Sequence, residues 1–148
     1  MTGFRNIFID TGAFLAMADP QDSFREAAVS FYRQLPAATT RISSWAVIAE
    51  SYTWLRYHLD GLKARTWLQR IDEAQDTGIL RLCYPDPNLD QRARRILQRM
   101  TDQTLSYTDA LSIGICQAQT DVDAVFAFDH RMALTGLPVF PGQVKRED

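Results

Sequence analysis

The chain has 148 residues, of which 46% are hydrophobic and 23% are charged, and its formal net charge is −2. This composition fits a folded domain with a substantial core and excludes a disordered chain. The charge excludes a broad basic surface for nucleic acid, although a metal ion can bridge an acidic site to phosphate. We expect one domain over residues 1–148, with a frayed polar tail from about Gly142.

The N-terminal region predicts neither a leader nor an anchor. Its apolar run, Ile7 to Ile9, stops at Asp10 and is too short for the apolar core of a signal peptide. No apolar run approaches the length of a membrane span. We therefore expect a cytoplasmic protein without membrane contact.

The first half of the chain predicts a short buried strand followed mostly by helices. The expected strands are Phe4–Ile9 and Arg41–Ile42, and the expected helices are Ala13–Ala18, Ser23–Leu35, Trp45–His58 and Leu62–Gln75. Ser23 and Glu26 have the spacing of a capping box, which favours a helix start at Ser23. Ser43 and Ser44 are typical residues before a helix, here the one at Trp45.

The second half continues the alternation of strands and helices. The expected strands are Ile79–Cys83, Val122–Phe128 and Pro138–Phe140, and the expected helices are Asn88–Met100 and Tyr107–Gln119. Such alternation is typical of α/β folds. We predict a three-layer α/β/α sandwich with a central, mostly parallel sheet of four to five short strands.

Two acids follow predicted strands. Asp10 ends the first strand, and Asp129 follows the apolar run Val125–Phe128. Ligands of open parallel sheets bind beyond the carboxyl ends of the strands, so both acids are candidates for a site. Each also has an ordinary alternative, because aspartate is common as a helix cap and as a turn residue.

Two further acids belong to predicted helices. Glu50 follows the apolar run Trp45–Ala49, where a buried carboxylate needs a partner or a metal, unless it reaches solvent at a rim. Asp109 stands three residues after Ser106, which matches a capping box. Converging at one edge of the sheet, the four acids would repel one another unless a cation were bound. Hard oxygen ligands select Mg²⁺ or Mn²⁺, and the matching chemistry is hydrolysis of a phosphodiester.

These motifs together resemble the PIN-domain ribonucleases, and most of all the VapC-type toxins. The motifs are an apolar strand followed by Asp10-Thr11, Glu50 within Ala-Glu-Ser, Tyr107-Thr108-Asp109-Ala110, Phe126-Ala127-Phe128-Asp129, and the late turn Gly136-Leu137-Pro138. The resemblance spans residues from about 4 to 141.

The resemblance implies an activity, a site and partners. The activity is Mg²⁺- or Mn²⁺-dependent endonucleolytic hydrolysis of RNA, as the toxin of a toxin–antitoxin pair. The catalytic and metal-binding acids would be Asp10, Glu50, Asp109 and Asp129, supported by the hydroxyl of Thr11. The implied assembly is a homodimer, silenced by a small antitoxin that inserts a segment near the acids. The alternative is a catalytically weak RNA-binding or regulatory module of the same fold.

Several basic and aromatic residues leave two interpretations open. His130 and Arg131 follow the fourth acid and are candidate RNA contacts, although His130 also suits an exposed turn. Arg92, Arg95 and Arg99 share one helical face, which is either a solvated face or a contact for phosphate or antitoxin. The middle helices are rich in aromatic residues, and most of these are expected in the core, with some lining an apolar groove for an antitoxin helix or a second protomer. These residues are Trp45, Tyr52, Trp54, Tyr57 and Trp67.

Other enzyme classes lack their motifs. An aspartyl phosphatase would have a second aspartate two residues after Asp10, where this chain has Gly12. A dinucleotide-binding fold would have a glycine-rich G-x-G-x-x-G loop after the first strand, and the sequence Asp-Thr-Gly-Ala-Phe does not supply it.

Overall fold

Five strands form one central sheet in the order β3-β2-β1-β4-β5, and all their pairings are parallel. The computed structural model describes residues 3–119 and 121–142. The strands are β1 Asn6–Ile9, β2 Thr40–Ser44, β3 Leu80–Cys83, β4 Ala124–Ala127 and β5 Val139–Pro141. The predicted α/β architecture is confirmed, and the sheet is parallel throughout these strands.

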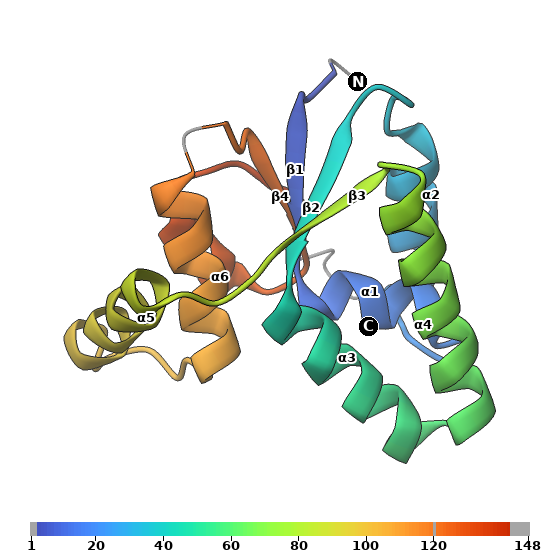
Figure 1. Cartoon of the computed structure of the whole chain (residues 1–148), viewed down its shortest axis with the longest axis horizontal. Coiled ribbons are helices and arrows are strands. Elements are labelled where there is room, and N and C mark those ends of the chain that lie inside the picture. Colours follow the sequence, from blue (N-terminus) through green and yellow to red (C-terminus); the bar gives the residue numbers. More distant parts are fainter. Residues whose placement is uncertain (1–2, 120, 143–148) are drawn as a thin grey trace, which may run out of the picture.

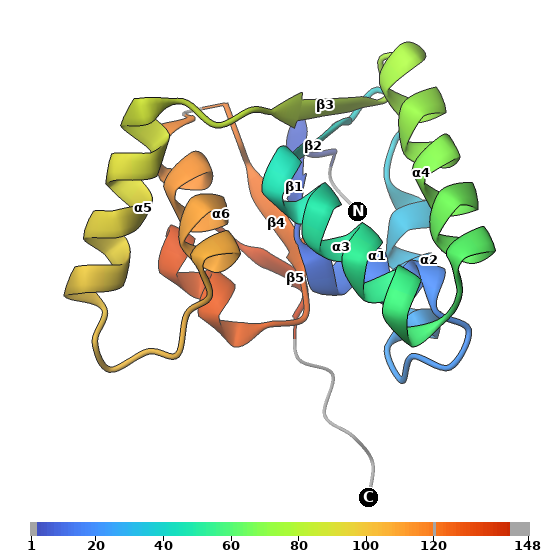
Figure 2. The same cartoon turned by 60° about the horizontal axis from the view of Figure 1, so that its bottom comes forward.

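Helices cover both faces of this sheet (Figure 1). They are α1 Thr11–Ala18, α2 Arg25–Gln34, α3 Trp45–His58, α4 Gly61–Asp76, α5 Pro87–Arg99 and α6 Tyr107–Ala118, with the 3₁₀ helix η1 at His130–Thr135. In both ribbon views α5 and α6 lie on one side of the sheet and α2 and α4 on the other (Figure 2). The predicted three-layer sandwich is therefore confirmed.

Strand β1 is the centre of the core. Ile7, Phe8 and Ile9 are at most 1% exposed, and Phe8 pairs with Ile42 of β2 and with Val125 of β4. A strand covered on both faces needs an apolar run instead of an alternating pattern, which explains the Ile-Phe-Ile sequence. The residue after this strand is consequently held in place from both sides.

Two helix starts differ from the predictions. Helix α1 begins at Thr11, directly after Asp10, and not at Ala13. Helix α2 begins at Arg25, and the predicted capping box at Ser23 does not form. The Asp22 carboxylate accepts the Phe24 N–H at 2.8 Å instead, so a turn centred on Asp22 replaces the cap.

The C-terminal region also differs in detail from the predictions. The fourth strand ends at Ala127, and the following helix η1 was not predicted. Gly136 ends η1 with a positive φ of 78°, which glycine adopts without strain. The expected frayed tail falls mostly on residues 143–148, which lie outside the described residues. Among the helices of the described chain, none has the length and apolar character needed to cross a membrane.

Candidate active site

All four predicted acids line one cavity of about 490 Å³. The cavity lies beyond the carboxyl ends of β1 and β4, where a parallel sheet places its ligands. Thr11 and Arg131 also line it, whereas His130 does not belong to its lining. The remaining wall comes from Gly12 and from the segment Thr104–Ser106 before α6.

Asp10 is the most deeply buried acid of the cavity, with 4% of its surface exposed. Its backbone N–H donates to the carbonyl of Phe126 at 3.1 Å, which ties the end of β1 to β4. It occupies the cap position of α1, but its side chain makes no capping hydrogen bond. The alternative role as a helix cap is therefore not realised by the carboxylate.

Burial and neighbouring charge both act on the Asp10 carboxyl. Together these effects raise its pKa from 3.8 to about 7, with desolvation as the largest cause. The Thr11 backbone N–H opposes the shift, and repulsion from Asp109, Asp129 and Glu50 contributes to it. Near neutral pH this carboxyl holds a proton for part of the time unless a cation offsets the repulsion.

The predicted capping box at the start of α6 is present. Asp109 belongs both to this capping box and to the lining of the cavity. The Ser106 hydroxyl accepts the Asp109 N–H at 3.0 Å, and Asp109 Oδ2 accepts the Ser106 N–H at 2.9 Å. The side chain is half-buried and lines the cavity. One carboxylate oxygen is thus held by the cap, which fixes the orientation of the other.

Glu50 lies at the rim of the cavity. Glu50 is exposed to solvent on α3, which agrees with the alternative in which it reaches solvent at a rim. It faces the acidic cavity on one side and an apolar groove on the other. A carboxylate at such a rim keeps its charge without the cost of burial and can reach an ion from the open side.

Asp129 is bound to Arg131. Arg131 Nη2 donates to Oδ2 at 2.6 Å, and Arg131 Nε donates to Oδ1 at 2.9 Å. Burial by itself raises the pKa of this carboxyl, but the hydrogen bonds and charge of Arg131 outweigh burial and hold the pKa below 3.8. Arg131 Nη1 also donates to the carbonyl of Thr104, which connects Asp129 to the segment before α6.

Thr11 presents a polar atom without a partner. Its Oγ1 is buried and makes no hydrogen bond in the described chain, while the residue itself lines the cavity next to Asp10. Buried hydroxyl groups in native proteins nearly always have a partner, so one is expected here from water or a bound group.

The donor set fits a divalent cation in its chemistry. Three carboxylates and one orphaned hydroxyl offer oxygen atoms only, which suits Mg²⁺ or Mn²⁺. The arrangement is nevertheless open, because in the described residues no three His, Cys, Asp or Glu side chains are close enough together to hold an ion. Asp10, Glu50 and Asp109 offer suitable oxygen donors but would have to draw closer together around an ion, whereas both oxygens of Asp129 are engaged by Arg131.

An apolar groove of about 780 Å³ adjoins the cavity at Glu50. Of the aromatic residues noted in the middle helices, Trp67 packs against the core, while Trp45 and Tyr57 are 51% and 79% exposed and line the groove. Trp54 also lines it, stacked on His58 with ring centroids 4.3 Å apart. The expectation that most of these rings belong to the core is therefore wrong.

Sequence reasoning missed the ion pair of Asp129 and Arg131. Arg131 was considered as an RNA contact and not as a partner of the acid two residues before it. The signal for this pair depends on η1, whose first turn brings the Arg131 side chain back over Asp129. An aspartate at the end of a strand, followed by arginine at the second position, is the pattern that would have indicated it.

Comparisons with known proteins agree with this fold. Residues 7–136 match the family model of the PIN domain. VapC20 of Mycobacterium tuberculosis, a toxin that cleaves the sarcin–ricin loop, has a similar structure with a TM-score of 0.76 and 21% identity over 88% of this chain and 95% of that chain. FitAcB of Neisseria gonorrhoeae gives a TM-score of 0.63 at 18% identity, over 90% of this chain and 96% of that chain.

A further similar structure is FitAB bound to an IR36 DNA fragment, with a TM-score of 0.67 and 16% identity over 96% of this chain and 99% of that chain. At such identities the similarity establishes the shared fold. No curated protein sequence matches the chain.

Proposed function

Because the chain belongs to the PIN-domain family, we propose that it is a metal-dependent endoribonuclease and the toxin of a toxin–antitoxin pair. The observation that carries the proposal is the cavity itself. Four carboxylates from four separate segments of the chain line it, at the edge of the sheet where parallel folds bind ligands. The resemblance to VapC-type toxins, and the structural similarity to a toxin that cleaves RNA, support the substrate class.

The proposed metal site comprises Asp10, Glu50 and Asp109, with the Thr11 hydroxyl beside it and Asp129 completing the acidic wall. A Mg²⁺ or Mn²⁺ ion bound there would lower the pKa of a bound water, polarise a phosphoryl oxygen and neutralise charge on the leaving oxygen. The fixed orientation of Asp109 in its capping box prepares it for this role, because a preoriented ligand loses little entropy on binding.

The remaining chemistry belongs to the protein side chains. Asp10 or Asp109 accepts a proton from the attacking water. The water oxygen bonds to phosphorus as the bond to the leaving oxygen breaks, and the leaving oxygen takes a proton from solvent. No covalent intermediate with the protein is required. Arg131 and the exposed His130 are the candidate RNA contacts beside the cavity, although the Arg131 guanidinium is already paired with Asp129.

The proposed partners follow from the resemblance. We infer a cytoplasmic homodimer that a small antitoxin silences by placing a segment near the acids. The apolar groove supports a partner, since an exposed apolar surface of this kind marks an interaction site. We propose that one of these two partners, the antitoxin or a second copy of the chain, covers the groove.

The test is RNA cleavage by purified protein with and without Mg²⁺ or Mn²⁺. Asp10→Asn and Asp109→Asn are each expected to reduce metal-dependent cleavage by roughly a hundredfold or more. Asp60→Asn is the matched control, because Asp60 caps α4 outside the cavity and asparagine also caps helices. Unchanged cleavage by either cavity variant would contradict the assignment.

A regulatory or RNA-binding module without efficient catalysis is the second candidate. The open arrangement of the acids and the pairing of Asp129 with Arg131 favour it. Thermal stability at millimolar Mn²⁺ distinguishes the two, because an ion that binds only the native state raises the melting temperature. A raised melting temperature supports the nuclease, and an unchanged one supports the module.

A further inference from the structure

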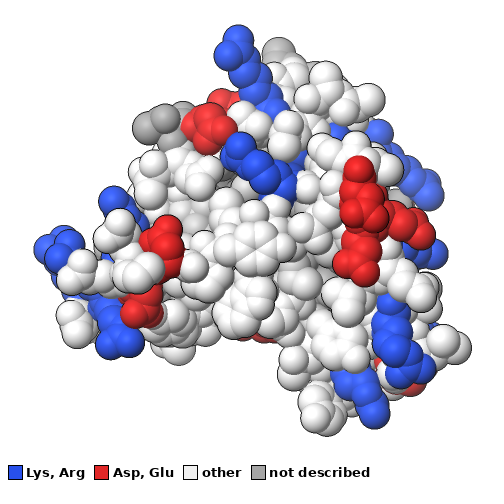
Figure 3. Space-filling view, viewed as in Figure 1, with Lys and Arg blue, Asp and Glu red and all other residues white. Residues whose placement is uncertain are grey.

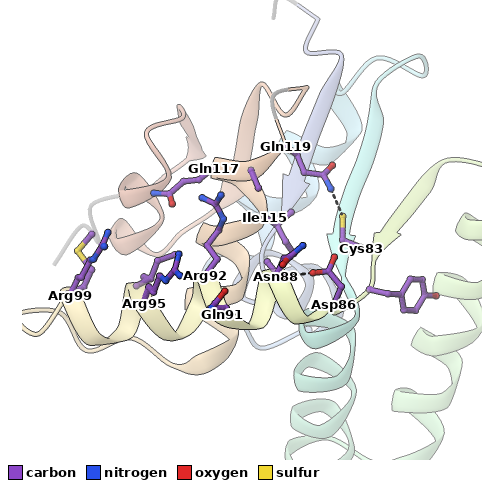
Figure 4. Close-up of a pocket in the computed structure, with 15 residues that line it drawn as sticks. Cys83, Asp86, Asn88, Gln91, Arg92, Arg95, Arg99, Ile115, Gln117 and Gln119 are labelled. Atoms are coloured by element: carbon purple, nitrogen blue, oxygen red, sulfur yellow. Dashed lines mark hydrogen bonds between the residues drawn. The ribbon is translucent and has the colours of Figure 1, made fainter.

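A second polar cavity, of about 570 Å³, lies between α5 and α6, away from the acids (Figure 4). We call it the basic groove. Its polar lining includes Asn88, Arg92, Arg95, Arg99, Gln117 and Gln119. The three arginines project from the same side of α5 (Figure 4). In the space-filling view, basic side chains lie over α5 at the left edge of the molecule (Figure 3).

The charge of the basic groove is not compensated. Arg94, which lies outside the groove, pairs with Asp90 at 3.1 Å. Neither Arg92, Arg95 nor Arg99 has such an acidic partner in the described part of the chain. Of the described residues, Asp86 is the one acid that lines the groove, and its carboxylate accepts the Leu89 N–H at 2.8 Å as a helix cap. A chain with a net charge of −2 therefore presents three unpaired positive charges together.

The close approach of α6 holds Arg92 in place. Gly114 of α6 lies against the arginine stem, and a Cβ at this position would come within 3.2 Å of Arg92 Cδ and 3.4 Å of Leu89 Cδ1. A glycine in a helix interior costs stability relative to alanine, so a packing reason is expected for it. Here the glycine admits the Arg92 stem between the helices, which directs the guanidinium into the groove.

The basic groove and the acidic cavity adjoin the same loop. Met100 lines the groove, and Thr104, Leu105 and Ser106 line the cavity. Thr104 comes five positions after Arg99, so their Cα atoms lie at most about 18 Å apart. A nucleic-acid strand advances about 3.4 Å per nucleotide when its bases are stacked, so about five nucleotides span this distance.

We propose that the basic groove binds the phosphate backbone of the RNA on one side of the bond that is cut. The inference rests on the proposed nuclease function. A polyanion that enters a cavity of four carboxylates needs compensating cations nearby, and the one arginine of that cavity is already paired with Asp129. Arginine suits this task because its planar, permanently charged guanidinium binds phosphate through two hydrogen bonds. The neighbouring amides add donors for phosphate and sugar oxygens, the contacts that position a strand without reading its bases.

The first experiment measures binding in the Asp10→Asn background, with a fluorescent single-stranded RNA of about twelve nucleotides. Arg95→Gln/Arg99→Gln is expected to bind about tenfold more weakly near 0.15 M salt, with a salt slope reduced by about 1.4, since each phosphate contact of a single strand contributes about 0.7. The matched control is Arg70→Gln/Arg94→Gln, which removes the same charge outside the groove. An equal loss in the control, or no loss in the groove variant, overturns the proposal.

The second experiment measures cleavage with Asp10 restored. On the longer RNA the groove variant is expected to raise KM about tenfold at unchanged kcat. On an RNA of about three nucleotides, too short to reach the groove, KM is expected to be unchanged. A variant that keeps full RNA affinity but loses binding to an acidic peptide would assign the groove to a protein partner instead. If the parent protein neither binds nor cuts RNA, the proposed function fails together with the inference, which separates that outcome from failure of the groove alone.

Discussion

Arg131 holds Asp129 through both carboxylate oxygens, at 2.6 Å to Oδ2 and 2.9 Å to Oδ1. The pair places a fixed positive charge at the wall of the acidic cavity, and this charge also acts on Asp10 and Asp109. The fourth acid is thus neutralised by the chain itself. Any cation that enters the cavity competes with this guanidinium.

Removing that guanidinium is expected to strengthen metal binding. Arg131→Gln frees Asp129 and removes a charge that repels the ion, so we expect Mn²⁺ to bind roughly tenfold more tightly. Titration calorimetry measures the affinity, with Arg94→Gln as a control for net charge. Weaker binding by Arg131→Gln would show that the arginine instead positions Asp129 as a ligand.

Metal-free protein is expected to lose stability as the pH rises from about 4 to about 7. Burial, with added repulsion from the other acids, raises the Asp10 pKa from 3.8 to about 7, so the folded state binds its proton more tightly than the unfolded state. This contribution is fully present below the unfolded pKa and is lost as the pH rises through the folded pKa. Denaturation in EDTA at a series of pH values measures it, and saturating Mn²⁺ should flatten the dependence.

Asp10→Asn is expected to stabilise the metal-free protein while it abolishes cleavage. Above pH 7 the substitution removes a buried charge. The pKa shift of Asp10 corresponds to a gain in the free energy of unfolding of up to about 4 kcal/mol. Urea denaturation at pH 8 checks the gain, with Asp60→Asn as the exposed control. A variant less stable than its parent at pH 8 would show that the carboxylate has a structural partner.

Removing either of two serine helix caps is expected to lower stability, but removing only one of them is expected to lower activity as well. Ser106→Ala and Ser44→Ala each remove a hydroxyl that accepts a helix N–H, at 3.0 Å and 3.1 Å, so each should cost about 1 kcal/mol of stability. Only the Ser106 cap also orients Asp109, whose carboxylate accepts the Ser106 backbone N–H at 2.9 Å. Alanine keeps this N–H but loosens the turn that presents it, so only Ser106→Ala should lose cleavage beyond its loss of folded protein. Chemical denaturation and initial rates measure the two effects, and equal rates at equal folded fraction would contradict a positioning role for the cap.

Self-association is expected to depend on the apolar groove. Tyr57 is 79% exposed there, so Tyr57→Ser should leave the stability of the monomer nearly unchanged and weaken the homodimer at least about tenfold. Tyr84, which is 60% exposed and lies outside the apolar groove, provides the control substitution Tyr84→Ser. Sedimentation over a range of concentrations measures both, and an unchanged dimer would leave the groove to another partner.

Local patterns predicted the structure where the side chains involved are neighbours in sequence. Ser106 and Asp109 form the capping box that their spacing indicates. Ser23 and Glu26 have similar spacing but do not, because Asp22 accepts the Phe24 N–H instead and Phe24 stacks on Phe128 with centroids 4.6 Å apart. The second contact joins segments about a hundred residues apart, and no local pattern contains it.

The convergence of the four acids was predicted from topology, because parallel strands end at one edge. The burial, exposure and pairing of each acid were not predicted. Whether a carboxylate is buried like Asp10, exposed like Glu50 or paired like Asp129 depends on how helices close over that edge. The basic groove could not be predicted either, since a shared helical face on α5 says nothing about how closely α6 packs beside it at Gly114.

The hydrogen bond from the Asp10 N–H to the Phe126 carbonyl has a consequence for synthesis of the chain on the ribosome. It joins the first strand to one more than a hundred residues later, so the acidic cavity forms only when nearly the whole chain has emerged. Contacts of such long sequence separation form late in folding. If the chain is the proposed nuclease, it stays inactive until its own translation is nearly complete.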